Sequence, residues 1–281
     1  MREISVLAIA RPGDVHGDLV VAELLARGVA AARLSLDTLR ESAIDWRMGN
    51  GLTIDRGEVI TANSTIWWRR PGRVATGDLS VEEGELIAAE GYDLLLGSLL
   101  ATRPRWVDHP HVASLAENKL HQLATAADLG IAVPPTIVTN RPASAEWLAA
   151  KGPIVTKAVS AGWGIAPQTR EVPQQLFDKV SVAPVLLQSR MRNVADLRVV
   201  TVGAQVFIWR RPRGSFEPVD WRAVDPSGDG FERVASNHAV TDQAIMLVEG
   251  LGVSQSSQDW IEGPDGLIFP GGQPGGPVAI P

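Results

Sequence analysis

The alternation of apolar and polar positions predicts an N-terminal α/β layer. The apolar run ISVLAIA at residues 4–10 has the length of a buried strand. The amphipathic stretch 16–34 predicts a helix that turns at Gly28 into a second strand. A strand–helix–strand opening of this kind is typical of a Rossmann-like layer. We therefore expect an N-terminal α/β domain over residues 1–105, which ends in the proline-containing stretch 102–111.

Three further elements are predicted in this domain: a hairpin over residues 48–61, a strand over 64–71 and a long helix over 80–102. Beyond it the pattern predicts a helix over residues 114–130, a short helix and several strands that pair mostly as antiparallel hairpins. The last hairpin covers residues 256–269, where a Pro-Asp-Gly turn joins two strands. The predicted class is α/β (α+β), with a central domain over residues 106–185 and a C-terminal domain over residues 186–281.

Composition narrows the class of protein. The chain has 281 residues and a formal net charge of -6, so no global basic field favours nucleic acid or an anionic membrane. It contains no apolar stretch long enough to cross a bilayer, and its first residues lack the cleavage site of a signal peptide. The absence of cysteine excludes disulfides, thiolate nucleophiles and cysteine-bound zinc. These features predict a soluble cytoplasmic protein.

Positively charged residues in apolar surroundings are the main candidates for chemistry. The chain has 22 arginines but only four lysines, and Lys157 lies in a predicted strand just before a glycine-containing loop. A lysine with a buried stem needs an anion, which is either a structural carboxylate or a ligand phosphate. Lys119, at a predicted helix start, is a second candidate phosphate contact; alternatively, it is an ordinary solvated lysine.

Two arginines and a glutamine extend this set of candidates. Arg198 and Gln188 lie within apolar predicted strands, and Arg222 follows Trp221. A buried guanidinium suits two-pronged contact with phosphate or carboxylate, although a structural salt bridge would explain it equally well. The sequence has neither a Walker phosphate loop nor a GxSxG nucleophile motif, and the five histidines show no metal-ligand spacing.

Several stretches occur together in an order that resembles a known family. They are TIWWRRP, ENKLHQLATAADLGIAVPPTIVTN, IVTKAV, VLLQSRM, DLRVVTVG, DWR and QDWIEGPDGLIF. In this order they resemble ATP-grasp ligases, and most closely the branch that matures ribosomal peptides, the microviridin-type or graspetide synthetases. The resemblance implies an ATP-grasp fold with an N-terminal pre-ATP-grasp domain. It also implies a homodimer that acts on a precursor peptide, leader plus core.

The resemblance assigns a role to each candidate residue. ATP would lie between two sheets, with Lys119 and Lys157 on its phosphates and Gln188 near the adenine edge. Arg198 and Arg222 would be the catalytic cations, facing the γ-phosphate and the acyl-phosphate. A substrate carboxylate would take the γ-phosphate, and a hydroxyl or amine would then displace phosphate to form an ester or amide. Such phosphoryl transfer depends on positioning and charge neutralisation by cations and Mg²⁺.

Two other functions remain open at this stage. One is an amide ligase of the kind represented by glutathione synthetase or the ribosomal-protein glutamate ligase. The other is a catalytically impaired remnant that binds a nucleotide or a peptide. A neighbouring gene for a small precursor rich in Thr/Ser and Asp/Glu would favour the peptide ligase, whereas ATP binding without turnover would favour the remnant.

The C-terminal tail departs from the family pattern at its metal motif. Such ligases hold Mg²⁺ with an Asp, which Asp259 matches, and with a Glu-x-Asn on the next strand. Here Gly271 stands at the Glu position and Gln273 at the Asn position, so the expected metal ligands are Asp259 and Gln273. Codons for residues 271–280 can be chosen so that a frame displaced by one nucleotide reads Glu-Val-Asn-Pro-Gly-Gly-Gln-Trp-Leu-Phe. We therefore expect a frameshift after Phe269; the alternative is a divergent Gly/Pro end.

Overall fold

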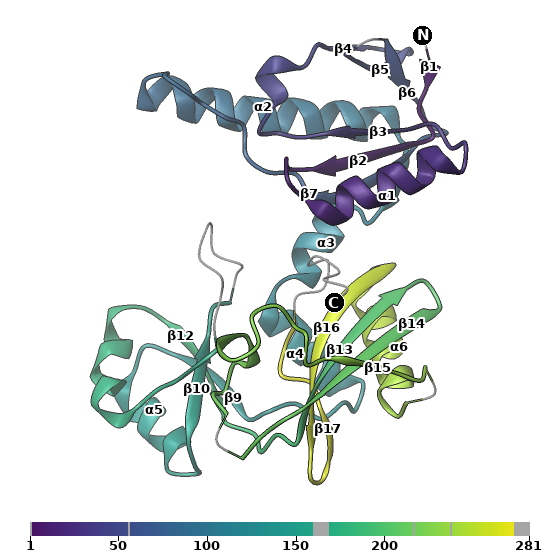
Figure 1. The fold of residues 1–281 in the computed structure, drawn as a ribbon. Coiled ribbons are helices and arrows are strands. Elements are labelled where there is room, and N and C mark those ends of the chain that lie inside the picture. Colours follow the sequence, from purple (N-terminus) through teal and green to yellow (C-terminus); the bar gives the residue numbers. More distant parts are fainter. Residues whose placement is uncertain (1, 56, 160–168, 216, 237, 273–281) are drawn as a thin grey trace. The chain divides into compact units, whose positions relative to one another are not determined.

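A computed structural model describes residues 2–55, 57–159, 169–215, 217–236 and 238–272. These residues form two compact units, Met1–Pro110 and His111–Pro281 (Figure 1). The division after Pro110 lies close to the domain boundary expected near residue 105. The further boundary expected between residues 185 and 186 stays a prediction.

A parallel four-stranded sheet in the order β3–β2–β7–β8 forms the centre of the first unit. Its strands are β2 (Val6–Ala10), β3 (Ala31–Leu34), β7 (Thr65–Arg70) and β8 (Arg105–Val107). Helix α1 (Val15–Ala26) joins β2 to β3, and α2 (Val81–Thr102) leads from β7 to β8. This arrangement confirms the predicted Rossmann-like layer.

Strand alternation assigns the two helices to opposite faces of this sheet. Leu95 and Leu99 of α2 belong to the same buried cluster as Leu7 and Ile9. Ala10 points to the other face, where Gly17 of α1 approaches so closely that an added Cβ would lie 3.1 Å from the Ala10 Cβ. The sheet is therefore covered on both sides, as its continuous apolar strands require.

A smaller sheet in the order β1–β6–β5–β4 completes the first unit. Its strands are β1 (Arg2–Glu3), β4 (Ile44–Arg47), β5 (Gly51–Ile54) and β6 (Glu58–Ile60), and the short helix η1 (Leu39–Glu41) precedes β4. Strands β5 and β6 pair antiparallel, which confirms the predicted hairpin. Leu52, Ile54 and Ile60 join the main core of this unit.

A buried ion pair lies at the start of α1, after the end of β2. Arg69 of β7 donates from Nε to both carboxylate oxygens of Asp14, at 2.9 and 3.1 Å, and the two side chains are 2% and 1% exposed. Asp14 also caps α1, because its Oδ1 accepts a hydrogen bond from the Gly17 amide. The WWRRP stretch thus contributes an arginine to the interior of the first unit.

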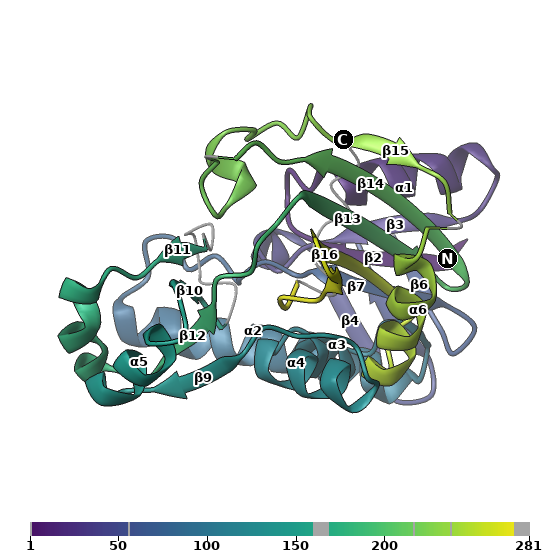
Figure 2. The same ribbon diagram turned by 90° about the horizontal axis from the view of Figure 1, so that it is seen from below.

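The second unit contains two separate β-sheets, which Figure 2 shows side by side. The four-stranded sheet has the order β11–β10–β12–β9. Its strands are β9 (Thr136–Thr139), β10 (Ile154–Lys157), β11 (Arg170–Glu171) and β12 (Val185–Ser189). Helices α5 (Pro142–Ala149) and η2 (Gln174–Val182) pack on one face, where Leu148, Phe177 and Leu187 share a core. The opposite face carries Lys157.

The five-stranded antiparallel sheet has the order β15–β14–β13–β16–β17. Its strands are β13 (Ala195–Val202), β14 (Gln205–Pro212), β15 (Glu232–Val234), β16 (Gln255–Gly263) and β17 (Gly266–Ile268). Helix α6 (Val240–Leu251) packs on one face, against Leu197, Val199 and Trp260. Strands β16 and β17 confirm the predicted final hairpin.

The helix predicted over residues 114–130 is two helices in the structure, and the single-helix prediction is wrong. Helix α3 (Pro110–Ala116) ends before Asn118, and α4 (Lys119–Asp128) begins immediately after it. The Asn118 side chain accepts hydrogen bonds from the amides of Leu120 and His121, which makes it the N-cap of a new helix. No helix in the described ranges is long and apolar enough to cross a bilayer.

Candidate active site

Arg198 and Asp259 face each other across neighbouring strands. They are register partners on β13 and β16, so their side chains leave the same face of the five-stranded sheet. Arg198 Nη1 lies 2.6 Å from Asp259 Oδ1. This is the face opposite α6, because Leu197 and Val199 on either side of Arg198 point into the α6 core. Both sequence candidates therefore belong to one site.

Arg222 reaches the same carboxylate from a loop. It lies in the short helix η3 (Trp221–Ala223) and places Nη2 3.2 Å from Asp259 Oδ2. Asp220 caps this helix by accepting the Arg222 amide and also contacts Arg222 Nη1 at 3.3 Å. Trp221 packs edge-on against Phe231, beside Val200, which fixes the loop on the sheet. The adjacent tryptophan thus holds Arg222 over Asp259.

Lys157 is the last residue of β10, and its side chain lies on the face of the four-stranded sheet opposite α5. Its ammonium donates a hydrogen bond of 3.0 Å to the Pro270 carbonyl oxygen, more than a hundred residues away in the chain. Burial lowers the pKa of Lys157 to about 8, although the Asp259 carboxylate acts in the opposite direction. Nearby Lys119 lowers it further. The lysine predicted to need an anion is therefore partly buried and, in the described residues, hydrogen-bonded to a neutral oxygen.

Gln188 lies on the same face of the four-stranded sheet as Lys157. Leu186 of β12 is the register partner of Lys157, and Gln188 follows two residues later, so the side chains point the same way. The Gln188 side chain is 1% exposed and donates to Thr136 Oγ1 at 3.0 Å. Its expected position near an adenine ring stays a prediction.

Lys119 opens α4 and is 6% exposed, which contradicts the alternative of a solvated helix lysine. Burial lowers the pKa of Lys119, while Glu117 and Asp259 raise it. One turn later, Gln122 is fully buried; its Nε2 donates to the Ala116 carbonyl oxygen at 2.7 Å. The first turn of α4 therefore presents a charged and a polar side chain on one face.

The beginning of the Gly/Pro tail packs into this site. Phe269 is 1% exposed and its amide donates to the Ala132 carbonyl oxygen, and residues 270–272 are buried. The Gly272 amide donates to Gln122 Oε1 at 3.0 Å. Gly271 has φ of +86°, a backbone conformation that favours glycine. Gln273, one of the two expected metal ligands, lies outside the described residues.

Four cations and two carboxylates therefore converge from five elements. The carboxylate of Asp259 interacts electrostatically with all four cations, which are Lys119, Lys157, Arg198 and Arg222. The second carboxylate, Asp220, contacts the Arg222 guanidinium. Burial alone would raise the pKa of Asp259, but Arg198 and Arg222 lower it below its ordinary value. With Glu117, which also acts on Lys119, the cluster keeps a formal excess of one positive charge, which suits a polyanion.

The described residues fit a polyphosphate better than they fit a metal ion. Buried ammonium and guanidinium groups with few carboxylates are the chemistry of phosphate recognition. Mg²⁺ requires oxygen ligands, usually including one or two carboxylates. Asp259 is one such carboxylate; each of its oxygens accepts one bond from a guanidinium group, which leaves a lone pair on each oxygen. Among the described residues, no group of three or more Asp, Glu, His or Cys side chains could hold a metal.

Three participants were not predicted from the sequence: Asp220, Gln122 and the carbonyl of Pro270. The DWR stretch was singled out for its arginine, yet its aspartate is 7% exposed and orients that arginine. Gln122 stands one turn after Lys119, and this spacing is the only signal that could have drawn attention to it. The Pro270 contact carried no sequence signal, because it depends on long-range packing.

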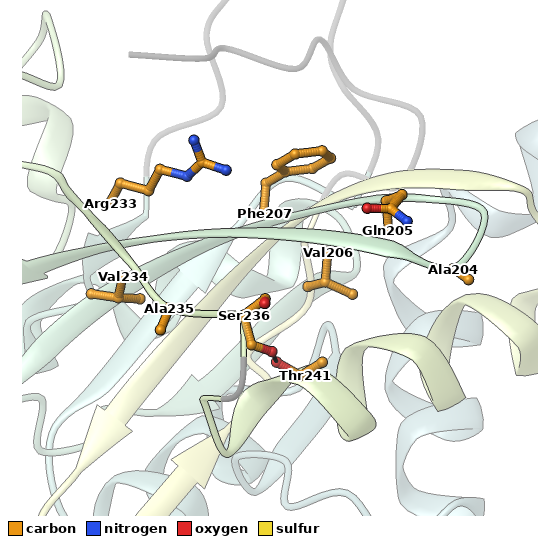
Figure 3. Close-up of a pocket in the computed structure, with 9 residues that line it drawn as sticks. All are labelled: Ala204, Gln205, Val206, Phe207, Arg233, Val234, Ala235, Ser236 and Thr241. Atoms are coloured by element: carbon orange, nitrogen blue, oxygen red, sulfur yellow. Dashed lines mark hydrogen bonds between the residues drawn. The ribbon is translucent and has the colours of Figure 1, made fainter.

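A cavity of about 390 Å³, separate from the charged cluster, lies beside the first residues of β14 (Figure 3). The start of β14, strand β15 with the residues after it, and Thr241 in the first turn of α6 line it. Arg233 lies with its guanidinium carbon 5.7 Å from the centre of the Phe207 ring, and Thr241 Oγ1 donates to the Ser236 carbonyl oxygen at 2.6 Å. None of the candidate residues from the sequence lines this cavity.

Comparison with known proteins gives a clear result for the fold. No protein-family model and no curated protein matches the sequence. Among solved structures, the macrocyclase MdnC of Microcystis aeruginosa MRC, bound with precursor peptide MdnA, aligns with a TM-score of 0.82 at 20% identity over 99% of this chain and 93% of its own. A RiPP-associated ATP-grasp ligase of Chryseobacterium gregarium, in complex with ADP and leader and core peptide, aligns with a TM-score of 0.84 at 20% identity over 99% and 90%.

A third solved structure agrees with these two. The ATP-grasp ligase PsnB, complexed with a phosphomimetic variant of a minimal precursor, Mg and ADP, aligns with a TM-score of 0.78 at 21% identity. This alignment covers 99% of the present chain and 92% of PsnB. The four-stranded and five-stranded sheets that carry the charged cluster are thus part of an architecture shared along nearly the whole chain. The protein has the ATP-grasp fold.

Proposed function

We propose that this protein is an ATP-dependent carboxylate–alcohol or carboxylate–amine ligase that acts on a ribosomally made precursor peptide, leader plus core. One observation carries the proposal: Lys119, Lys157, Arg198 and Arg222 converge around Asp259 within an ATP-grasp fold. Similarity to ligases solved with precursor peptides supports the choice of substrate. The ATP requirement favours a cytoplasmic location, and a homodimer stays a prediction for analytical ultracentrifugation.

In this proposal each side chain has a defined task. ATP supplies the phosphoryl group that converts a substrate carboxylate into an acyl-phosphate. Lys119 and Lys157 hold the phosphates from two sides, and Gln188 lies toward the base. Arg198 and Arg222 stabilise the charge that develops on the transferred group, which is the largest contribution that positioned cations make to such a reaction. Asp220 and Trp221 orient Arg222 before substrate arrives.

A second candidate is a remnant that binds nucleotide but turns over slowly. It is favoured by one observation, which is that both oxygens of the only expected carboxylate ligand are bonded to arginines. The two candidates separate when the chain is incubated with ATP and the peptide encoded beside its gene. A mass spectrum that shows loss of water from the peptide supports the ligase. ATP binding without any dehydrated peptide supports the remnant, and formation of an amide on a free amino acid supports a small-molecule ligase.

Replacing Lys157 with alanine is expected to weaken ATP binding by about 1.5–3 kcal/mol, the range for a charge-assisted contact in a buried site. Lys119 is 6% exposed and interacts with the same Asp259 carboxylate, so we expect Lys119→Ala to weaken binding as well. Isothermal titration calorimetry measures both effects. Lys151→Ala is the matched control, since the Lys151 ammonium lies over the Trp147 ring, outside the site. Equal affinity for wild type and Lys157→Ala would refute the assignment.

The affinity for ATP is expected to fall as the pH rises above about 8, the pKa of Lys157 in the free protein. Only the charged ammonium attracts phosphate, so its contribution is present below this pH and is lost as the lysine deprotonates. Bound phosphate raises the pKa, so the decline should extend over the following pH units. Lys157→Arg is the control, because a guanidinium stays charged. A decline of the same size in Lys157→Arg would contradict the prediction.

A further inference from the structure

The loop that carries Arg222 joins β14 to β15 and covers residues 213–231. The Arg222 side chain is 38% exposed, so contacts elsewhere in the loop have to hold it over Asp259. Fixing a long side chain and its loop costs conformational entropy, which such contacts offset. Packing of the adjacent tryptophan is one contribution, and two further arginines of this region make another.

Arg213 anchors the backbone of the loop directly before η3. Its guanidinium donates from Nη1 to the Val219 carbonyl oxygen at 3.3 Å, and from Nη2 to the Pro218 carbonyl oxygen. The next residue, Asp220, caps η3 and contacts the Arg222 guanidinium. The Arg213 side chain is only 5% exposed, so these bonds are shielded from water. Arg213 therefore fixes the chain at the point where η3 begins.

Asp196 orients Arg213 in turn. It lies on β13 two residues before Arg198, so both side chains leave the face of the sheet that carries the charged cluster. Arg213 Nη1 donates to both Asp196 oxygens, at 3.0 and 3.3 Å, and Asn193 Nδ2 donates to Asp196 Oδ1 at 2.8 Å. A continuous series of hydrogen bonds thus leads from β13 through Arg213 to the cap of η3.

Arg211 holds the loop on both sides of η3. It is the register partner of Asp196 on β14. Its Nη1 donates to Glu217 Oε2 at 2.7 Å, before the helix, and its Nε donates to Asp225 Oδ2 at 3.2 Å, after the helix. A guanidinium can make such divergent contacts in a fixed geometry, whereas an ammonium cannot. The carboxylates of Asp196, Glu217 and Asp225 neutralise Arg211 and Arg213, so these arginines hold the loop and are not available to a phosphate.

We propose that Arg211 and Arg213 are positioning residues, which set the place of Arg222 over the nucleotide phosphates and affect the nucleotide only through Arg222. The inference rests on the proposed nucleotide site and deepens it, because it extends the machinery to two arginines that contact no part of the charged cluster around Asp259 in the printed hydrogen bonds of that cluster. A positioned cation stabilises phosphate only from a fixed geometry, which these contacts supply.

A double-mutant cycle on ATP affinity, measured by calorimetry, tests the coupling. Arg213→Lys keeps the positive charge but cannot hold two carbonyl oxygens and a carboxylate at once, so we expect ATP binding to weaken by about 3–10-fold. Arg222→Ala should weaken binding by about tenfold, and the double variant should bind within about twofold of Arg222→Ala alone. If the two effects multiply to about 30-fold or more, Arg213 acts independently of Arg222 and the inference is wrong.

A purely structural role predicts a different result. Arg213→Lys would then lower the free energy of unfolding in urea while the folded variant bound ATP as the wild type does, and the inference would be overturned. An absence of ATP binding by the wild type would instead overturn the proposed function on which the inference rests. A milder variant, Glu217→Gln, keeps an acceptor for Arg211 and should weaken ATP binding by about 2–5-fold, only when Arg222 is present.

Arg210→Lys is the matched control. Arg210 lies on the same strand but leaves its opposite face, where it pairs with Glu262 by two bonds of 2.8 and 3.0 Å. The substitution disrupts a two-pronged ion pair without touching the loop, so we expect ATP affinity to stay within about twofold of the wild type. A loss equal to that of Arg213→Lys would contradict the inference.

Discussion

A chain whose reading frame is restored after Phe269 is expected to turn over its precursor peptide at least ~10²-fold faster than the chain described here. Restoration would place Glu at position 271 and Asn at position 273, the ligands that the family motif provides for Mg²⁺. A second carboxylate would let a metal ion stabilise charge on the transferred phosphoryl group. Single-turnover assays followed by mass spectrometry of the peptide measure the ratio of the two rates.

The backbone of the tail indicates that a single substitution at position 271 would not be enough. Gly271 has φ of +86°, which disfavours a glutamate at this position. A Cβ added at Gly272 would lie 3.3 Å from the Asp259 amide nitrogen and 3.4 Å from the Gln258 Cα. The segment as it stands is therefore adapted to glycine, and Gly271→Glu alone would add strain as well as charge. Gly271→Glu serves as the control and should recover little activity.

The restored chain should also gain metal dependence of nucleotide binding. The ratio of ATP affinity in Mg²⁺ to affinity in EDTA should be larger for the restored chain than for the chain described here. If the two chains cross-link their peptide at equal rates, the metal argument is wrong. Sequencing the locus gives an independent answer, because an intact frame with no displaced Glu-x-Asn-Pro would contradict the frameshift.

Replacing Asp14 with alanine is expected to destabilise the first unit by about 3–5 kcal/mol, because it leaves the Arg69 guanidinium buried without its carboxylate. Arg69 is 2% exposed, and its Nη2 already lacks a hydrogen-bond partner in the structure. The substitution also removes the N-cap of α1. Urea unfolding measures the loss of stability.

Asp18→Ala is the matched control for this effect. Asp18 pairs with Arg33 at the surface, where the two side chains are 54% and 30% exposed, so we expect a loss of at most about 1 kcal/mol. Equal losses for the two variants would contradict the prediction. Burial raises the pKa of Asp14, but the Gly17 amide and Arg69 together lower it below its ordinary value. The ion pair therefore contributes its full stability above the ordinary pKa of an aspartate. This contribution declines as the pH falls through the lowered pKa of Asp14.

Local pattern determined most of the elements of this protein. The apolar run at residues 4–10 and the Pro-Asp-Gly turn before β17 each encode their structure within a few residues. The break between α3 and α4 was missed because the apolar period continues across it. There the side chain of Asn118 decides the outcome by capping a new helix.

The order of motifs along the chain was also sufficient to indicate the fold. Lys157, Arg198, Arg222 and Asp259 could be singled out because charged residues within or beside apolar strands require partners. Which partners they have could not be read from the sequence. Lys119 illustrates the difference, since a first helical residue is usually solvated and this one is 6% exposed.

Tertiary structure decided what these residues do together. The register of β13 against β16 puts Arg198 opposite Asp259, and the packing of Trp221 brings Arg222 to the same carboxylate. Contacts between residues 61 or 37 positions apart have no local signature, because they depend on register and loop packing over the whole unit. The sequence by itself determined the elements, the fold and the charged candidates. Only the folded chain showed that the expected metal ligand is held by two arginines, since ion pairing depends on distances that sequence spacing does not specify.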